Sequence, residues 1–95
     1  FNGGQVCVAG SRLYAHRSVF DRVVEGVAAR AKSITLGHGL DPATQMGPLI
    51  SAAHAGKVAA YIEGGRGAGA SVLTGGAQDG AFVTPTVITG VKPDM

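Results

Sequence analysis

The only cysteine of the chain, Cys7, lies between two valines and is flanked by small residues. Its thiolate form is among the best nucleophiles that a protein carries, so covalent attack on an electrophile is the first chemistry to consider. Gly3 and Gly4 precede the cysteine and Ala9-Gly10-Ser11 follows it, so backbone and ligand can come close to the sulfur. Free cysteine is also among the most buried residue types. The stretch therefore favours a reactive thiol and leaves an inert, packed thiol open.

Three histidines, His16, His38 and His54, could act together with Cys7 as metal ligands or as a base. From Cys7 onward the four positions are separated by 9, 22 and 16 residues, which matches no zinc pattern, and no Cys-x-x-Cys is present. We therefore expect no metal site. A hydrolase in which one histidine deprotonates Cys7 stays open, although no local signature supports it. The six acidic residues lie on predicted helix faces or in turns, so we expect any general base for Cys7 outside this chain.

A glycine-rich run at residues 64–69 resembles a phosphate-binding loop in composition only. A dinucleotide fingerprint requires such glycines between a strand and the following helix, whereas this run ends a predicted helix before a strand. The run therefore predicts a flexible helix end.

The composition indicates a folded segment and excludes several classes of protein. Of the 95 residues, 45% are hydrophobic and 15% are charged, so we expect some apolar faces to pack against sequence that is not present here. The net charge of +2 is scattered without a basic run, and aromatic residues make up only 5%, which argues against a nucleic-acid partner. The apolar stretches are too short to span a bilayer and no signal-peptide pattern opens the chain, so we expect a soluble cytoplasmic protein with no membrane partner.

Two helices are predicted to support the cysteine stretch. Apolar residues recur at steps of three and four over residues 18–33, with Ser18 as the N-cap and Asp21 completing a capping box. A second helix starts at Ser51, which can cap it, and ends in the glycine run. Its apolar stripe consists of Ala55, Val58, Ala59 and Ile62.

Short strands are predicted around these helices, at residues 13–15, 71–74 and 82–88. Pro85 cannot donate to a ladder, so the last strand is expected to be interrupted or at an edge. Residues 36–48 read as a long loop because of their glycines and prolines. The order strand-helix-loop-helix-strand-strand predicts an α/β fold with a right-handed crossover and a parallel sheet.

The cysteine stretch as a whole, Gly4-Gln5-Val6-Cys7-Val8-Ala9-Gly10-Ser11-Arg12, closely resembles the active-site motif of the NAD(P)-dependent aldehyde dehydrogenases. The resemblance continues in the right order through Phe20-Asp21, Gly37, Leu40-Asp41-Pro42, Met46-Gly47-Pro48-Leu49, Tyr61-Ile62, Gly69-Ala70, Gly75-Gly76 and Pro85-Thr86-Val87. It implies that residues 1–95 are a segment of the catalytic domain, with the dinucleotide-binding and oligomerisation parts outside the chain. The family is usually dimeric or tetrameric, so a homodimer or homotetramer is expected for the full-length protein.

The resemblance also implies a mechanism in which Cys7 attacks an aldehyde to give a thiohemiacetal. Hydride passes to NAD or NADP, and water hydrolyses the resulting thioester to the carboxylic acid. The backbone N–H of Cys7 shares the oxyanion with an asparagine side chain that is not Asn2 and that, like the glutamate activating water, precedes this chain. An isolated polypeptide of 95 residues is therefore expected to show no turnover.

Five further residues receive roles from the same resemblance. Gln5, Val6 and Val8 are expected to line the aldehyde pocket, and the two valines favour an apolar or aromatic aldehyde. His54 matches a position from which the family reaches the nicotinamide ribose, and Lys57 lies one turn further on. For these last two residues a solvated helix face is the alternative.

Two other functions remain open from the sequence. Relatives that pass the thioester to coenzyme A or phosphate differ at residues outside this chain. A non-catalytic α/β scaffold with a buried, inert cysteine belongs to a different class, and the accessibility of the thiol separates it from an enzyme.

Overall fold

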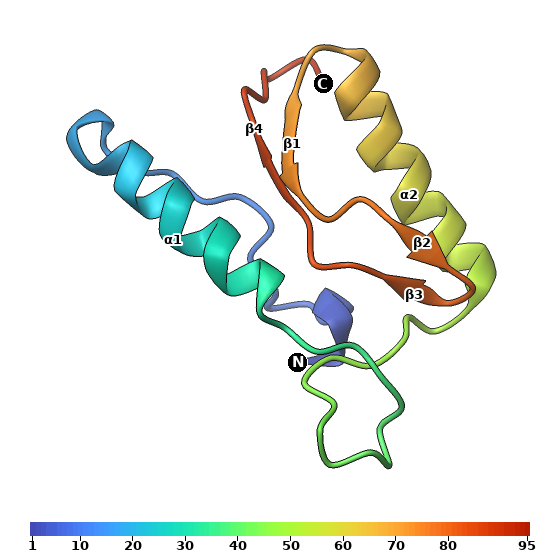
Figure 1. Ribbon diagram of the computed structural model, residues 1–95. Helices are drawn as coiled ribbons and strands as arrows, with labels where there is room; N and C mark the ends of the chain where they lie inside the picture. The colour runs from blue at the N-terminus through green and yellow to red at the C-terminus, as the bar shows by residue number, and fades with distance from the viewer.

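The computed structural model describes all residues from 1 to 95 and measures 41 × 26 × 23 Å along its principal axes (Figure 1). The elements, in chain order, are the 3₁₀ turns η1 (Asn2–Gly4) and η2 (Arg17–Val19), the helices α1 (Phe20–Lys32) and α2 (Ala52–Gly67), and the strands β1 (Ser71–Thr74), β2 (Gln78–Asp79), β3 (Phe82–Val83) and β4 (Val87–Thr89). Mixed helices and strands confirm the predicted α/β class.

The strands form two antiparallel pairs, so the predicted parallel sheet with a right-handed crossover is wrong in its detail. β1 pairs with β4, with Val72 opposite Ile88, and β2 pairs with β3 in a short hairpin. All four strands follow one another after the second helix, and short connections of this kind lead to antiparallel pairing. The isolated bridge between Leu36 and Met46 is parallel.

Pro85 interrupts the last predicted strand, as expected. β3 ends at Val83 and β4 begins at Val87, and Pro85 lies between them. Its carbonyl oxygen lies so close to Gly75 that a Cβ at Gly75 would collide with it, and the φ of Gly75 is +79°. Only glycine fits at Gly75 without strain.

The first helix begins at Phe20, and the predicted cap by Ser18 is wrong. His16 Nδ1 instead accepts a hydrogen bond from the backbone N–H of Ser18 at 3.2 Å, which starts η2 one turn earlier. No side chain caps α1 itself. The strand predicted at residues 13–15 does not form either, because this extended stretch makes no ladder hydrogen bond with another segment.

The second helix follows the prediction more closely. Ser51 Oγ accepts a hydrogen bond from the backbone N–H of His54 at 3.1 Å and so caps α2. In the predicted apolar stripe, Ala55 is 0% exposed and Ile62 is 6% exposed. The helix ends at Gly67, inside the glycine run that was expected to end it.

The core is small and lies on one side of the molecule. Leu49, Ala55, Ile62 and Val83 form its buried cluster. Both α1 and α2 contact β1, and they lie on opposite sides of the β1–β4 pair (Figure 1). Apolar side chains such as Tyr14, Leu40 and Tyr61 stay almost fully exposed.

The long loop predicted at residues 36–48 is held by its own hydrogen bonds. Gln45 Oε1 accepts a hydrogen bond from the backbone N–H of Thr35 at 2.9 Å, and the N–H of Gln45 donates to the carbonyl of Thr35 at 2.9 Å. The N–H of Gly37 donates to the carbonyl of Met46 at 3.2 Å.

Neither helix of the molecule has the length and apolar character needed to cross a bilayer.

Candidate active site

Cys7 lies in a tight surface turn, and its side chain is exposed. The N–H of Ala9 donates to the carbonyl of Val6 at 3.0 Å and closes this turn, while the N–H of Cys7 itself has no acceptor within the chain. The exposed thiol contradicts the alternative of a buried, inert cysteine. Its free N–H lies next to the sulfur, where a donor could stabilise negative charge on a bound carbonyl oxygen.

The residues before the turn adopt an unusual backbone conformation. Asn2, Gly3 and Gly4 have φ values of +50°, +59° and +82°, all in the left-handed region. At Gly3 a Cβ would lie 3.1 Å from Leu49 Cδ2, so η1 approaches the core closely at this point. The cysteine turn is thus tied to the segment that precedes α2.

Gln5 provides the second connection between these two segments. Its side-chain Oε1 accepts a hydrogen bond from the backbone N–H of Ile50 at 3.1 Å, across 45 positions of sequence. Its Nε2 donates to the carbonyl of Asn2 at 3.2 Å. Both polar ends of this side chain are therefore bonded to backbone.

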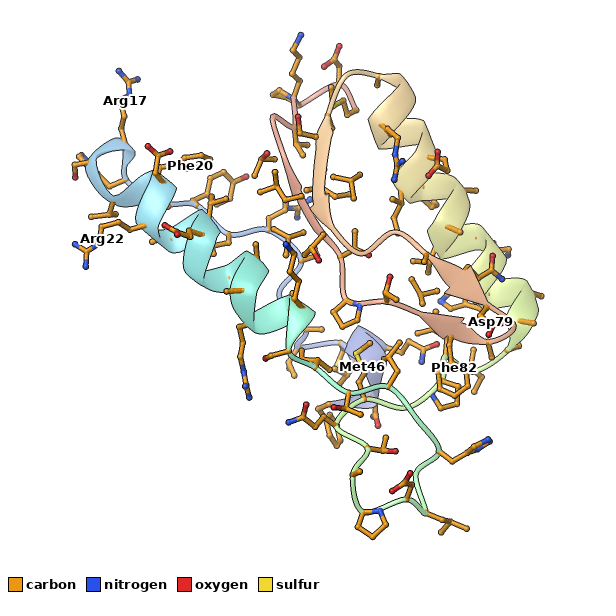
Figure 2. The ribbon with its side chains drawn as sticks, viewed as in Figure 1. Arg17, Phe20, Arg22, Met46, Asp79 and Phe82 are labelled. Atoms are coloured by element: carbon orange, nitrogen blue, oxygen red, sulfur yellow. The ribbon has the colours of Figure 1, made fainter.

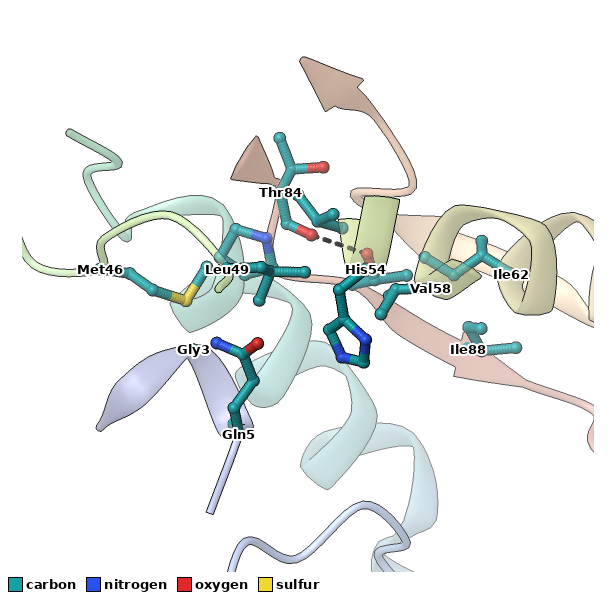
Figure 3. A pocket seen from close by; sticks show the side chains of 13 residues that line it. Gly3, Gln5, Met46, Leu49, His54, Val58, Ile62, Thr84 and Ile88 are labelled. Carbon is teal, nitrogen blue, oxygen red and sulfur yellow. Dashed lines mark hydrogen bonds between the residues drawn. The ribbon is translucent and has the colours of Figure 1, made fainter. Parts of the chain in front are cut away.

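An open cavity of about 540 Å³ lies between η1, α2 and the strands, and its wall includes Gln5, Met46, Leu49, His54, Val83 and Thr84. Gln5 and His54 project into this space from different elements (Figure 3). The dashed line in Figure 3 is the bond in which the Thr86 hydroxyl donates to the carbonyl of Thr84 at 2.7 Å. The half-buried His54 ring has no hydrogen-bond partner in the chain. It is thus free to bind a polar ligand.

The other predicted site residues lie away from this cavity. Cys7 and Val6 do not line it, and Val6 is half-buried, whereas Val8 is 85% exposed. Lys57 is exposed one turn after His54 and makes no ion pair. The structure therefore brings Gln5 and His54 to one cavity and leaves the thiol and Lys57 on the surface.

Met46 and Thr84 line the cavity although neither is predicted from sequence to belong to the site. Each lies in or beside a stretch that carries the family resemblance, Met46-Gly47-Pro48-Leu49 or Pro85-Thr86-Val87. Their place in or beside these stretches is the sign in the sequence that they could belong to the site. Their convergence depends on how the loop and the β2–β3 hairpin fold back onto α2, which no local pattern encodes.

The three histidines have separate places in the fold. His16 bonds to Ser18, and the His38 ring meets the Phe82 ring edge-on, with centroids 6.2 Å apart. Figure 2 shows Phe82 directed from β3 toward the loop that carries His38. No group of three or more His, Cys, Asp or Glu side chains is arranged to hold a metal ion. Among the histidines, His54 is the one that lines the cavity.

Comparison with known proteins gives a consistent result over the whole chain. The family model described as "Aldehyde dehydrogenase family" matches residues 1–95. The mitochondrial aldehyde dehydrogenase of Leishmania tarentolae is 46% identical over 98 aligned residues, covering 100% of this chain and 20% of that protein. The chain thus spans about a fifth of the length of the relatives that it matches.

Two solved structures extend the likeness to the fold. Betaine aldehyde dehydrogenase from Staphylococcus aureus in complex with NAD+ is 38% identical, with a TM-score of 0.94 over 100% of this chain and 20% of that one. The NAD+ complex of aldehyde dehydrogenase from Bacillus cereus is 43% identical, with the same TM-score of 0.94 and the same coverage.

Proposed function

Because the chain belongs to the aldehyde dehydrogenase family, we propose that it supplies the nucleophilic cysteine of an enzyme that oxidises an aldehyde to a carboxylic acid. The observation that carries this proposal is the exposed Cys7 thiol, presented on a turn with an unpaired N–H inside the matched segment. Residues 1–95 are then a segment of the catalytic domain of a longer enzyme. That enzyme acts as a cytoplasmic homodimer or homotetramer.

In the first step the Cys7 thiolate attacks the carbonyl carbon of the aldehyde. A carbon–sulfur bond forms and the carbonyl electron pair moves onto oxygen, giving a tetrahedral thiohemiacetal. The N–H of Cys7 donates to this oxyanion as the charge develops. Val8 is exposed and Val6 half-buried on either side of Cys7 in the sequence, and the exposed valine gives the aldehyde an apolar surface to contact.

Two donors on α2 fit a dinucleotide. The His54 ring projects into the cavity without a partner, and the Lys57 ammonium is unpaired one turn away. Hydroxyl groups of a nucleotide ribose are suitable partners for both. NAD or NADP, when bound, supplies the hydride acceptor that turns the Cys7 thiohemiacetal into a thioester.

Release of the product breaks the carbon–sulfur bond of the thioester and returns the thiolate to Cys7. With water as the acyl acceptor the product is a carboxylic acid, whereas coenzyme A or phosphate would yield an acyl derivative. Assay of the full-length enzyme with and without coenzyme A and phosphate separates these relatives. A rate that does not depend on either acceptor identifies the hydrolytic enzyme.

The test of the proposal is Cys7→Ser in the full-length enzyme. We expect aldehyde oxidation to fall by roughly 10⁴-fold or more, because the hydroxyl is a far weaker nucleophile than the thiolate. Binding of NAD or NADP, measured by fluorescence titration, should change by less than about twofold, since the cysteine turn is not on the cavity wall. Retention of dehydrogenase activity by this variant would contradict the proposal.

A further inference from the structure

The Gln5 side chain can adopt only one orientation in its hydrogen bonds. An N–H donates and a carbonyl oxygen accepts, so only Oε1 can bond the N–H of Ile50 and only Nε2 can bond the carbonyl of Asn2. Gln5, two positions before Cys7, is therefore connected through its side-chain amide to Ile50, 45 positions further along the chain. No polar atom of this side chain is left without a partner.

The segment that Gln5 reaches is one of the best-held parts of the chain. Leu49 is 8% exposed and its N–H donates to the carbonyl of Ala81 at 2.8 Å, which fixes it to the β2–β3 hairpin. Ile50 is followed directly by Ser51, the cap of α2. A bond to Ile50 is therefore a bond to the start of the helix that carries His54.

On the other side, the same amide organises the backbone that leads to the thiol. The carbonyl of Asn2 accepts from Nε2 of Gln5 and also from the backbone N–H of Gln5 at 3.0 Å. The N–H of Val6 then donates to the carbonyl of Gly4 at 2.9 Å, directly before the cysteine turn. Rotation of the Gln5 side chain away from these partners would leave only the close approach of Gly3 to Leu49 between this stretch and the segment before α2.

We propose that Gln5 is a positioning residue, which holds the Cys7 turn at a fixed position relative to the start of α2 and does not itself bind the aldehyde. The inference rests on the proposed function, in which Cys7 must meet a carbonyl carbon at a defined place relative to the dinucleotide. A misplacement of about 1 Å in such a geometry lowers a rate by up to about 100-fold. In this role both polar ends of the Gln5 amide are bonded to backbone and not to the aldehyde, so its loss should change kcat and leave the aldehyde KM nearly constant.

Three variants of the full-length enzyme test this role. Gln5→Met removes both hydrogen bonds at similar volume, whereas Gln5→Glu keeps an acceptor for Ile50 and loses the donor to Asn2. Gln45→Met is the matched control, because Gln45 Oε1 also accepts from a backbone N–H, that of Thr35, in the loop before α2. The control loses a comparable hydrogen bond without touching the cysteine turn.

We expect Gln5→Met to lower kcat by about 10- to 100-fold, with aldehyde KM within about threefold for both short and long aldehydes. Gln5→Glu should recover kcat to within about fivefold of the parent enzyme, because the bond to Ile50 remains. Gln45→Met, which loses one side-chain hydrogen bond against two in Gln5→Met, should lower the melting temperature by at least half as much while keeping kcat within about twofold. Hydrogen exchange in the peptide containing Ile50 should accelerate in Gln5→Met and stay slow in Gln5→Glu.

Other results overturn the inference. A change in KM that varies with the aldehyde, at constant kcat, would make Gln5 a substrate contact. Equal losses of kcat in Gln5→Met and Gln45→Met would make it an ordinary structural residue. Unchanged exchange at Ile50 in Gln5→Met would show that the bond does not hold the segments together. The exchange measurement needs neither aldehyde nor nucleotide. It therefore tests whether Gln5 holds Ile50 in place even if Cys7→Ser refutes the proposed function.

Discussion

Two regions of this molecule are stabilised by different interactions. Residues 1–16 contain the proposed nucleophile, no α-helix or strand and no buried residue, and they keep their shape through turn hydrogen bonds and the Gln5 amide. All five buried residues lie between Leu49 and Val83, around α2 and the strands that it covers. The thiol is thus presented by a surface loop, while the apolar packing is concentrated in the neighbouring scaffold.

This difference predicts whether a mutation in each region changes mainly the stability of the fold or mainly the rate of the reaction. Apolar burial contributes most of the stability of a fold, so changes in the α2 region should act mainly on unfolding. Loops that carry chemistry depend on being positioned by a rigid scaffold, so changes in residues 1–16 should act mainly on rate. Variants of the α2 region test whether stability and rate separate in this way.

The largest effect is expected for Gly75→Ala in the full-length enzyme. A Cβ there would collide with the carbonyl of Pro85 at a φ of +79°, so we expect the free energy of unfolding to fall by about 3 kcal/mol. Gly80→Ala is the control, because its φ is +55° and no atom lies within 4 Å, and we expect about 1 kcal/mol. Denaturant unfolding measures both.

The same two variants test the division between the regions. The kcat per reactive thiol of the folded Gly75→Ala enzyme should match that of the parent, with the thiols counted by iodoacetamide labelling. A lower kcat per folded enzyme would mean that the turn at Gly75 also positions the nucleophile, and the comparison would fail.

A smaller effect is expected for His54→Leu, which removes the unpaired ring from the cavity wall. We expect the Kd of the dinucleotide to rise about tenfold, the equivalent of one lost hydrogen bond. Lys57→Met should raise it only about threefold, because the ammonium is exposed to solvent. Titration with NAD and with NADP measures both variants.

Thiol labelling is the control for these two cofactor variants. Labelling of Cys7 by iodoacetamide without nucleotide should change by less than about twofold, since neither side chain touches the cysteine turn. An unchanged dinucleotide Kd in His54→Leu would remove α2 from the cofactor site.

The smallest effect is expected for Ser51→Ala, which deletes the cap of α2. We expect a local loss of about 1 kcal/mol, seen as roughly fivefold faster hydrogen exchange in the first turn of that helix. Ser18→Ala should cost less than about 0.5 kcal/mol, because Ser18 does not cap α1. Equal effects at both serines would restore the sequence-based assignment of Ser18 as a cap.

The features that could be predicted from sequence are local ones. The Ser51 cap and the stripe through Ala55 and Ile62 depend on residues within one or two turns of each other, and both are confirmed. Pro85 interrupts its strand wherever that strand pairs, because proline has no N–H to donate. The small neighbours of Cys7 predict an accessible sulfur, and its side chain is exposed, although no pattern predicts the turn that carries it.

The larger error arose where a partner distant in sequence decides the outcome. Antiparallel pairing of β1 with β4 depends on the chain reversing at the β2–β3 hairpin, and the α/β pattern alone does not specify that. The Ser18 error is local: the His16 ring accepts a hydrogen bond from the N–H of Ser18 and starts η2, and no side chain caps α1. The cavity shared by Gln5 and His54 likewise depends on a contact across 45 positions.

That contact also has a consequence for the order of folding. Closing a loop of 45 residues costs about 3 kcal/mol of chain entropy, more than the 0.5 to 1.5 kcal/mol that one hydrogen bond contributes. The bond between Gln5 and Ile50 can therefore form only after packing of α2 against the strands has brought the two segments together. We expect the Cys7 turn to reach its place last, so that the native geometry at Cys7 reports a completed fold.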